Sequence, residues 1–223
     1  MNALDKMFKI PVIINNRDLL TWPRKMVEKI KTYDNVGEII IYDNNSTYEP
    51  LIEWYDTKPC TIVRGENIGH TGPWESGVVD KLNSEYYIVT DPDLGIDDTP
   101  TNTLNYLFDK LNKFNIPKIG LGLEWELTPA ESPYFEHIIN YEKKRFNNSR
   151  FIDNVYLDVL VDTVFALYKT KNYFIGGAST GGMYRAKHYP WYFTETDRNN
   201  DYEFMYYIKN ANTSSSYKTF LGI

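Results

Sequence analysis

Cysteine is nearly absent from this chain of 223 residues, in which Cys60 stands alone. A single cysteine rules out an internal disulfide and fits a reducing compartment. The chain also lacks any apolar run near the ~20 residues that a membrane span requires, and residues 1–9 have no apolar signal-peptide core. We therefore expect a soluble, cytoplasmic protein with no transmembrane segment.

Basic residues are fewer than acidic ones, because 24 Lys and Arg stand against 30 Asp and Glu and give a formal net charge of −6. No basic tract stands out, which argues against a nucleic-acid partner. An acidic chain needs a cation or local basic groups to bind phosphates. The hydrophobic content of 42% and the length indicate one globular domain over residues 1–223.

The apolar pattern predicts an α/β fold. Short runs rich in β-branched residues at 10–14, 38–42 and 61–63 alternate with segments of helical spacing at 19–32 and 51–56. Such units form parallel sheets with right-handed crossovers, so we expect a Rossmann-like domain with a mostly parallel central sheet flanked by helices. Further helices are expected over 74–82, 101–114, 135–146 and 201–208, and further strands at 118–125 and within 156–168.

Residues 86–95 carry the first chemical signal. A run typical of a buried strand leads into Asp91-Pro92-Asp93. Residues i and i+2 of an extended chain point to the same side, so both carboxylates would face one point. Carboxylates that close repel each other, and Mg²⁺ or Mn²⁺, which prefer oxygen ligands, would remove the conflict. A solvated acidic turn is the alternative.

Polar side chains also follow the first three expected strands. Asn16 and Arg17 follow the first, Asp43 follows the second, and the loop at 64–73, with Asn67, follows the third. In open α/β sheets, ligands bind at the carboxyl ends of the strands, so these residues are candidates for a binding site. The alternatives are an Asx turn or helix cap for Asp43, a surface ion pair for Arg17 and a turn-forming role for Asn67.

Six short segments occur in the order found in GT-A glycosyltransferases, and the chain most resembles their family-2-type inverting group. The segments are residues 13–17, 42–47, 67–69, 91–93, 181–185 and 200–203. They are similar to the first-strand ending, the second-strand ending, the N-x-G loop, the D-x-D motif, the acceptor-side G-G segment and the start of the helix that carries the base. The resemblance implies a nucleotide-binding part at 10–95 and an acceptor-side part at 96–210.

The activity that this resemblance implies is metal-dependent transfer of the hexosyltransferase type. The donor would be a nucleotide-sugar, with UDP as the expected nucleotide, and the acceptor a hydroxyl of a glycan or similar molecule, with inversion at the anomeric carbon. Three segments depart from the family pattern: Asn44-Asn45, residues 73–77, where a basic group is lost, and Asn200. The alternative function is a non-catalytic nucleotide- or carbohydrate-binding module of the same fold. A sugar-phosphate nucleotidylyltransferase shares the architecture, but the glycine-rich loop of that family is not found at residues 15–18.

The resemblance also implies roles for single residues. Those that would line the nucleotide are Asn16, Arg17, Asp43 and Asn67. Asp93 would bind Mn²⁺ or Mg²⁺ directly, and Asp91 would bind the metal through water or contact the ribose. His188 is the candidate third metal ligand, with a structural histidine as the alternative.

Inverting transfer requires a carboxylate that takes the proton from the acceptor hydroxyl. The resemblance assigns this general base to Asp201, with Glu203 as the runner-up. Asp162 and Glu195 remain alternatives. The structural alternative for Asp201 is a cap of the helix that follows it.

Overall fold

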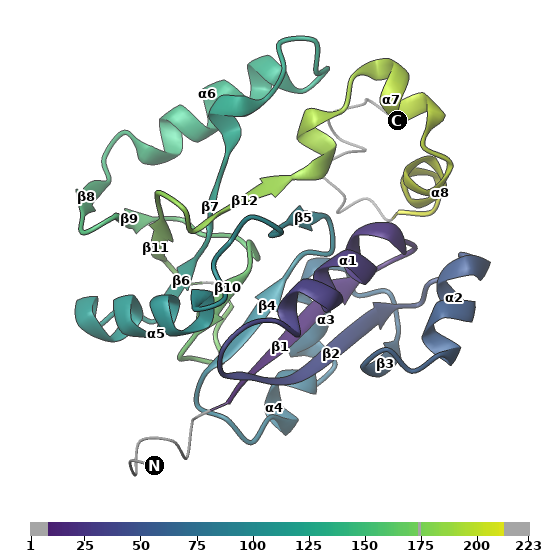
Figure 1. The fold of residues 1–223 in the computed structure, drawn as a ribbon, viewed down its shortest axis with the longest axis horizontal. Coiled ribbons are helices and arrows are strands. Elements are labelled where there is room, and N and C mark those ends of the chain that lie inside the picture. Colours follow the sequence, from purple (N-terminus) through teal and green to yellow (C-terminus); the bar gives the residue numbers. More distant parts are fainter. Residues whose placement is uncertain (1–8, 174, 212–223) are drawn as a thin grey trace.

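The first half of the chain alternates strands and helices, as its apolar pattern predicts. The computed structural model describes residues 9–173 and 175–211. Up to the Asp91-Pro92-Asp93 stretch the elements are β1 (Ile10–Asn16), α1 (Thr21–Ile30), β2 (Val36–Asn44), α2 (Glu49–Asp56), β3 (Thr61–Gly65), α3 (Gly72–Glu75), α4 (Val78–Lys81) and β4 (Tyr87–Thr90) (Figure 1).

The second half has mostly shorter strands. Its elements are β5 (Leu94–Gly95), α5 (Thr103–Phe114), β6 (Lys118–Gly120), β7 (Gly122–Leu123), α6 (Phe135–Phe146), β8 (Arg150–Ile152), β9 (Val155–Val159), β10 (Ala166–Tyr168), β11 (Gly177–Thr180), β12 (Arg185–His188), α7 (Glu195–Asn200) and α8 (Tyr202–Asn210). The helices expected at 135–146 and 201–208 are confirmed as α6 and α8. Across the described ranges, no helix combines the length and apolarity needed to cross a membrane.

The strands form a nine-stranded sheet in the order β3-β2-β1-β4-β10-β6-β11-β9-β8 and a three-stranded sheet in the order β5-β12-β7. Parallel pairing joins β1 to both β2 and β4, and β2 to β3. β10 then runs antiparallel between β4 and β6, whereas β6 and β11 are parallel. The predicted α/β fold with a large central sheet flanked by helices is confirmed. Its parallel pairs are concentrated in the first half, and the antiparallel pairs of the second half make the sheet mixed rather than mostly parallel.

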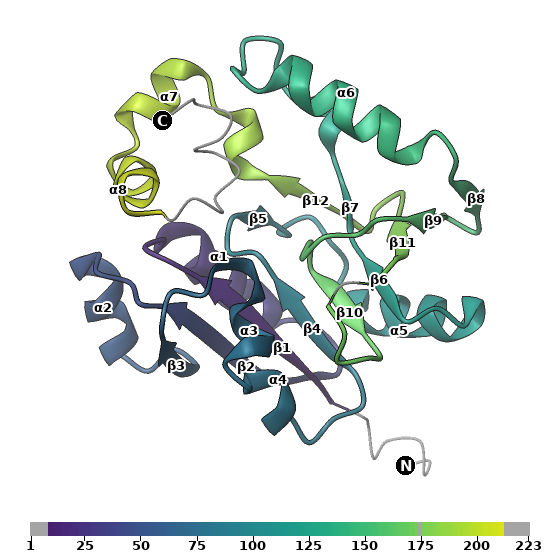
Figure 2. The same ribbon diagram turned by 180° about the vertical axis from the view of Figure 1, so that it is seen from behind.

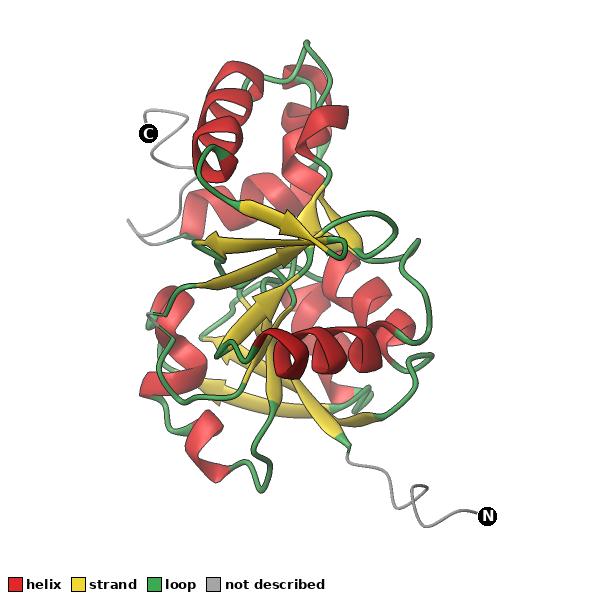
Figure 3. Ribbon diagram, turned by 90° about the vertical axis from the view of Figure 1, so that its left-hand side faces the viewer, coloured by secondary structure: helices red, strands yellow, loops and turns green. Residues whose placement is uncertain are grey.

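Helices cover both faces of the large sheet because its central strands are apolar on both sides. All residues of β1 are buried, as expected for a parallel strand between two layers. Met26, Val27 and Ile30 of α1 pack on one face together with α5, while Trp74 of α3 and Val78 of α4 pack on the opposite face. Figures 1 and 2 show these two faces, and Figure 3 shows the helices on both sides of the strands.

Two expected elements are divided in the structure. The single helix expected at 74–82 is wrong, because Gly77 adopts a φ of +75° between α3 and α4. The single strand expected at 118–125 is also wrong, because β6 and β7 belong to different sheets. A Cβ atom on Gly122 would lie only 2.1 Å from the Thr180 carbonyl oxygen, so the crossing between the sheets requires glycine.

The last helix returns to the beginning of the fold. Phe204 and Ile208 of α8 pack in one cluster with Leu19 and Trp22, at the start of α1. The three-stranded sheet lies on the same side of the molecule as α7 and α8 (Figure 2). As a result, the carboxyl ends of β1 and β2 face α8, and the exit of β4 faces β5 and β12.

Candidate active site

The loop after β3 is held against the carboxyl ends of β1 and β2 by two asparagines. Asn44 Oδ1 accepts the N–H groups of Ile68 at 3.2 Å and Gly69 at 3.1 Å, and its Nδ2 donates to Asn15 Oδ1 at 2.6 Å. Asn15 Nδ2 in turn donates to the Gly69 carbonyl at 3.1 Å. An aspartate at position 44 would accept but could not donate, which explains why an amide stands there. Asn67 lies in the loop that these bonds fix.

Asp43 is buried at the end of β2 and is hydrogen bonded within its own turn. The Ser46 N–H donates to Asp43 Oδ2 at 3.2 Å, and the Ser46 hydroxyl donates to Oδ1. Arg64 Nε lies 3.2 Å from Oδ2 and forms an ion pair with it. These contacts are those of an Asx turn, which is the alternative named above for Asp43. A base-binding role for Asp43 stays a prediction, in which a nucleobase would share the carboxylate with Ser46 and Arg64.

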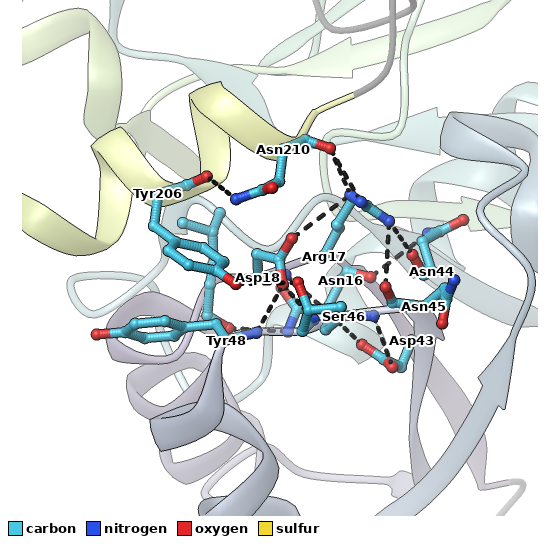
Figure 4. A network of polar contacts seen from close by, with 12 residues as sticks. Asn16, Arg17, Asp18, Asp43, Asn44, Asn45, Ser46, Tyr48, Tyr206 and Asn210 are labelled. Carbon is cyan, nitrogen blue, oxygen red and sulfur yellow. Dashed lines mark hydrogen bonds and ion pairs between the residues drawn. The ribbon is translucent and has the colours of Figure 1, made fainter.

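Arg17 joins the carboxyl edge of the sheet to α8 (Figure 4). Its Nη1 donates to the Asn44 carbonyl at 2.5 Å, and its Nε and Nη2 donate to the Asn210 carbonyl at 3.2 and 2.9 Å. Asn16 is buried beside it and donates to the Leu19 carbonyl at 2.8 Å. The guanidinium therefore binds backbone carbonyls, and its Nε also forms a 3.6 Å ion pair with the buried Asp18 carboxylate. Its predicted role toward phosphate would require it to exchange these partners.

Asp91 leaves β4 in contact with the loop that precedes β10. The Asp91 N–H donates to the Thr163 carbonyl at 2.9 Å, and Thr163 Oγ1 donates to Asp91 Oδ1 at 2.7 Å. Phe165 also donates its N–H to the Thr163 carbonyl, at 3.1 Å, and has a φ of +41°, which is strained for a bulky residue. The loop conformation thus fixes one oxygen of the Asp91 carboxylate.

The three-stranded sheet brings Asp93 and His188 together. β12 pairs with β5 and sets His188 opposite Leu94, the residue after Asp93. His188 Nε2 lies 3.6 Å from Asp93 Oδ1, and both side chains are largely buried. The two residues that the sequence predicts as metal ligands from distant parts of the chain are therefore neighbours.

Burial shifts the pKa values of Asp91 and His188. It raises the pKa of Asp91 well above its ordinary value, an effect that Asp162 and Asp93 strengthen and that Thr163 and Lys118 oppose. Burial also lowers the pKa of His188, against the attraction of Asp93 and Asp162 for its charged form. The result is a neutral imidazole next to carboxylates that repel one another. In the described part of the chain, however, no three His, Cys, Asp or Glu side chains are close enough to hold a metal by themselves.

A cavity of about 540 Å³ opens beside Asp91, between the end of β4, α6 and the loop before β10. All three histidines of the chain line it, although sequence reasoning gave a role only to His188. Lys118, Asp162 and Arg145 line it as well. Sequence analysis missed the cavity because α6 and the loop before β10 lie far from Asp91 in the chain. The available signals were a lysine at the start of the apolar run of β6 and Asp162 within another apolar run.

Asp201 and Glu203 lie outside the lining of this cavity. Asp201 Oδ1 accepts the Phe204 N–H at 2.9 Å and caps α8, which is the structural alternative named for it. Glu203 Oε1 accepts the N–H groups of Leu20 and Thr21, both at 2.8 Å, and therefore binds the start of α1. The structure brings Asp162, and neither of these two, next to Asp91.

We expect Glu203→Ala to lower the free energy of unfolding by about 1–2 kcal/mol, because the start of α1 loses an anionic partner for its free N–H groups. Glu195→Ala is the matched control, since that side chain is 76% exposed and its ion pair with Arg198 is long at 3.6 Å. Urea unfolding of both variants measures the difference. Equal midpoints for the two variants would contradict the anchoring role of Glu203.

Comparisons with known proteins find solved structures that are remotely similar to this chain. No protein family description and no curated protein matches the chain. Glucosyl-3-phosphoglycerate synthase from Mycobacterium tuberculosis, solved with Mn²⁺, UDP-glucose and phosphoglyceric acid, matches 52% of this chain and 44% of its own at 15% identity and a TM-score of 0.42. CMP:2-keto-3-deoxy-manno-octonic acid synthetase complexed with CTP matches 74% of this chain and 65% of its own at 12% identity and a TM-score of 0.43. In both cases the chain spans less than two thirds of the solved protein.

Proposed function

We propose that the chain is a glycosyltransferase that takes a sugar from a nucleotide-sugar donor, with UDP as the first nucleotide to test, and moves it to a hydroxyl acceptor. The observation that carries this proposal is the position of Asp91 and Asp93. They follow β4 at the edge where β1 and β2 also end, and Asp91 lines a cavity large enough for a sugar. A donor could place its nucleotide along the edge and its sugar in the cavity.

The side chains of Asp91, Asp93 and His188 suit a divalent cation that binds together with the nucleotide-sugar. Mg²⁺ is commonly held by one or two carboxylates together with substrate phosphates and water. Asp91 and Asp93 would supply the carboxylates, and His188, whose imidazole is kept neutral by burial, would supply a nitrogen. Such a cation, Mn²⁺ or Mg²⁺, would neutralise charge on the leaving diphosphate. Burial of Asp91, together with the charges of Asp162 and Asp93, raises the pKa of its carboxyl group, and a cation at this position would offset both effects.

The acceptor hydroxyl needs a carboxylate within reach as it attacks the anomeric carbon. Asp162 is the better placed candidate, because it is exposed at the cavity and acts electrostatically on Asp91. Asp201, which the sequence favoured, is the second candidate and would have to exchange its capping bond for this role. Thr163 would hold Asp91 in place through the hydroxyl bond described above. Inversion at the anomeric carbon follows from a single displacement of this kind.

Thermal unfolding with UDP, GDP, dTDP and CMP, each with and without Mn²⁺, tests the donor site. A ligand at 100 times its dissociation constant stabilises a fold by ~2.7 kcal/mol. We expect one nucleotide to raise the melting temperature only when Mn²⁺ is present. Asp93→Asn should remove this response, while Asp98→Asn, at a carboxylate that is mostly exposed, should keep it. No response to any nucleotide would contradict the donor site.

A non-catalytic binding module is the second candidate. The observation that favours it is that Arg17, Asp43 and Asp201 all have internal partners in this structure. Release of free nucleotide from a bound nucleotide-sugar, with multiple turnovers, would exclude this candidate. Metal-dependent nucleotide binding without any turnover across a broad acceptor panel would favour it.

A further inference from the structure

The cavity wall formed by β6 and α6 contains two buried cations. Lys118 is 2% exposed, and the Arg145 side chain is 9% exposed. Both residues line the cavity, on elements that the sequence separates by more than twenty positions. Buried cations are rare unless they are paired or bind a ligand.

The described residues use only part of the hydrogen-bonding capacity of these two cations. Lys118 Nζ donates to the Val161 carbonyl at 2.5 Å and lies 4.7 Å from the centre of the Tyr168 ring. An ammonium has three protons, so at least one remains for a further acceptor. Arg145 Nη1 donates to Glu142 Oε1 at 2.8 Å, while Arg145 Nε is buried with no hydrogen-bond partner among the described residues.

Carboxylates as well as cations face this wall. Glu142 is the ion-pair partner of Arg145, and burial raises the pKa of Glu142. Asp162 and Asp91 attract Lys118, yet burial still lowers the pKa of Lys118 to about 8, and the charge of Arg145 contributes to this shift. These carboxylates do not use all the donors of Lys118 and Arg145 described above, and a buried cation with unused donors favours an anionic ligand.

We propose that Lys118 and Arg145 form a subsite for an anionic group, a carboxylate or a phosphate, on the acceptor. This inference rests on the proposed glycosyl transfer, since it names the class of acceptor that the cavity would take. Lys118 would contact the anion directly, and Arg145 would bind it through the donors that Glu142 leaves unused. The anionic group would orient the acceptor so that a hydroxyl lies near Asp162 at the same cavity.

Calorimetric titration with three sugars of one ring type tests this subsite without nucleotide or metal. The probes are glucose, glucuronate and glucose 6-phosphate. We expect the wild-type protein to bind at least one anionic sugar at least ten-fold more tightly than glucose, and the tighter of the two identifies the group. Lys118→Met, which keeps an unbranched side chain but removes the terminal ammonium, should weaken anion binding at least ten-fold. Lys144→Met, at an exposed lysine of the same helix as Arg145, should leave it unchanged.

A second variant tests the subsite if Lys118→Met does not fold. Arg145→Met combined with Glu142→Gln removes the other cation without leaving an unpaired carboxylate, and it should also weaken anion binding at least ten-fold. Equal binding of glucose and both anions, no anion binding at millimolar concentration, or wild-type affinity in a folded cavity variant would overturn the subsite. Asp93→Asn should still bind the anionic sugar, so a failure of the donor site is distinguishable from a failure of the anion site.

Discussion

Asp162→Asn is expected to lower sugar transfer by about 10²- to 10⁴-fold, the range that a positioned general base contributes. Asparagine keeps the oxygen that accepts the Thr163 N–H at 2.9 Å, so the loop before β10 should keep its conformation. The amide cannot take a proton from the acceptor, whereas donor binding does not require this carboxylate. Steady-state kinetics should therefore show a fall in kcat, with metal-dependent UDP binding unchanged by thermal shift.

Asp201→Asn is the matched comparison, because asparagine caps a helix about as well as aspartate and preserves the bond to the Phe204 N–H. We expect transfer within a few-fold of wild type. The reverse pattern, an inactive Asp201 variant and an active Asp162 variant, would return the base to Asp201. Such a result would also mean that α8 moves when substrate binds, since Asp201 lies outside the cavity lining in this structure.

Phe165→Ala is expected to lower the free energy of unfolding by about 3–5 kcal/mol, the usual range for a buried phenylalanine. Phe165 is fully buried and packs edge-to-face on Tyr33, with ring centres 5.9 Å apart. Alanine retains a Cβ atom, so the strain of a φ of +41° stays while the aromatic packing is lost. Urea unfolding with a two-state fit measures the difference.

Phe151→Ala is the control for this loss, since Phe151 lies on β8 and is 55% exposed. Its ring contacts Tyr156 at a centroid distance of 4.4 Å, so a change of less than about 1 kcal/mol is expected. A similar change in both variants would show that the buried position of Phe165 adds nothing. A large loss at Phe165 alone supports the tight packing of the loop that holds Asp91.

Local signals in the sequence predicted most of the first half of the fold, although not the break at Gly77. Strands such as β1 read as continuous apolar runs because parallel strands are buried on both faces. α6 was also predicted with its observed bounds, from a segment that is polar and aromatic. The glycines of residues 118–125 indicated a close backbone approach, but not that the chain passes there from one sheet to another. That outcome depends on Thr180, a partner nearly sixty residues away.

The candidate site divides in the same way. Asp91 and Asp93 were recognised because they stand two positions apart directly after a strand. The position of Asp43 at a strand end followed from the order of elements. Their partners were not accessible to such reasoning. Thr163, His188 and Lys118 reach the site through pairing of β10, β12 and β6, and each pairing joins segments far apart in the chain. Whether Asp201 acts as a cap or a base also depends on where α8 packs.

The sequence by itself determined the class of fold, the polar carboxyl edge of the first strands and the acidic pair after β4. These features depend on periodicity and on neighbours in the chain, which local residue types encode. Only the tertiary structure decided which carboxylate lies at the cavity and that two cations are buried on one wall of it. It also decided that α8 contacts the end of β1 through Arg17 and the start of α1 through Glu203. Burial and charge pairing arise between distant segments, and the free energies that set them exist only once the chain is packed.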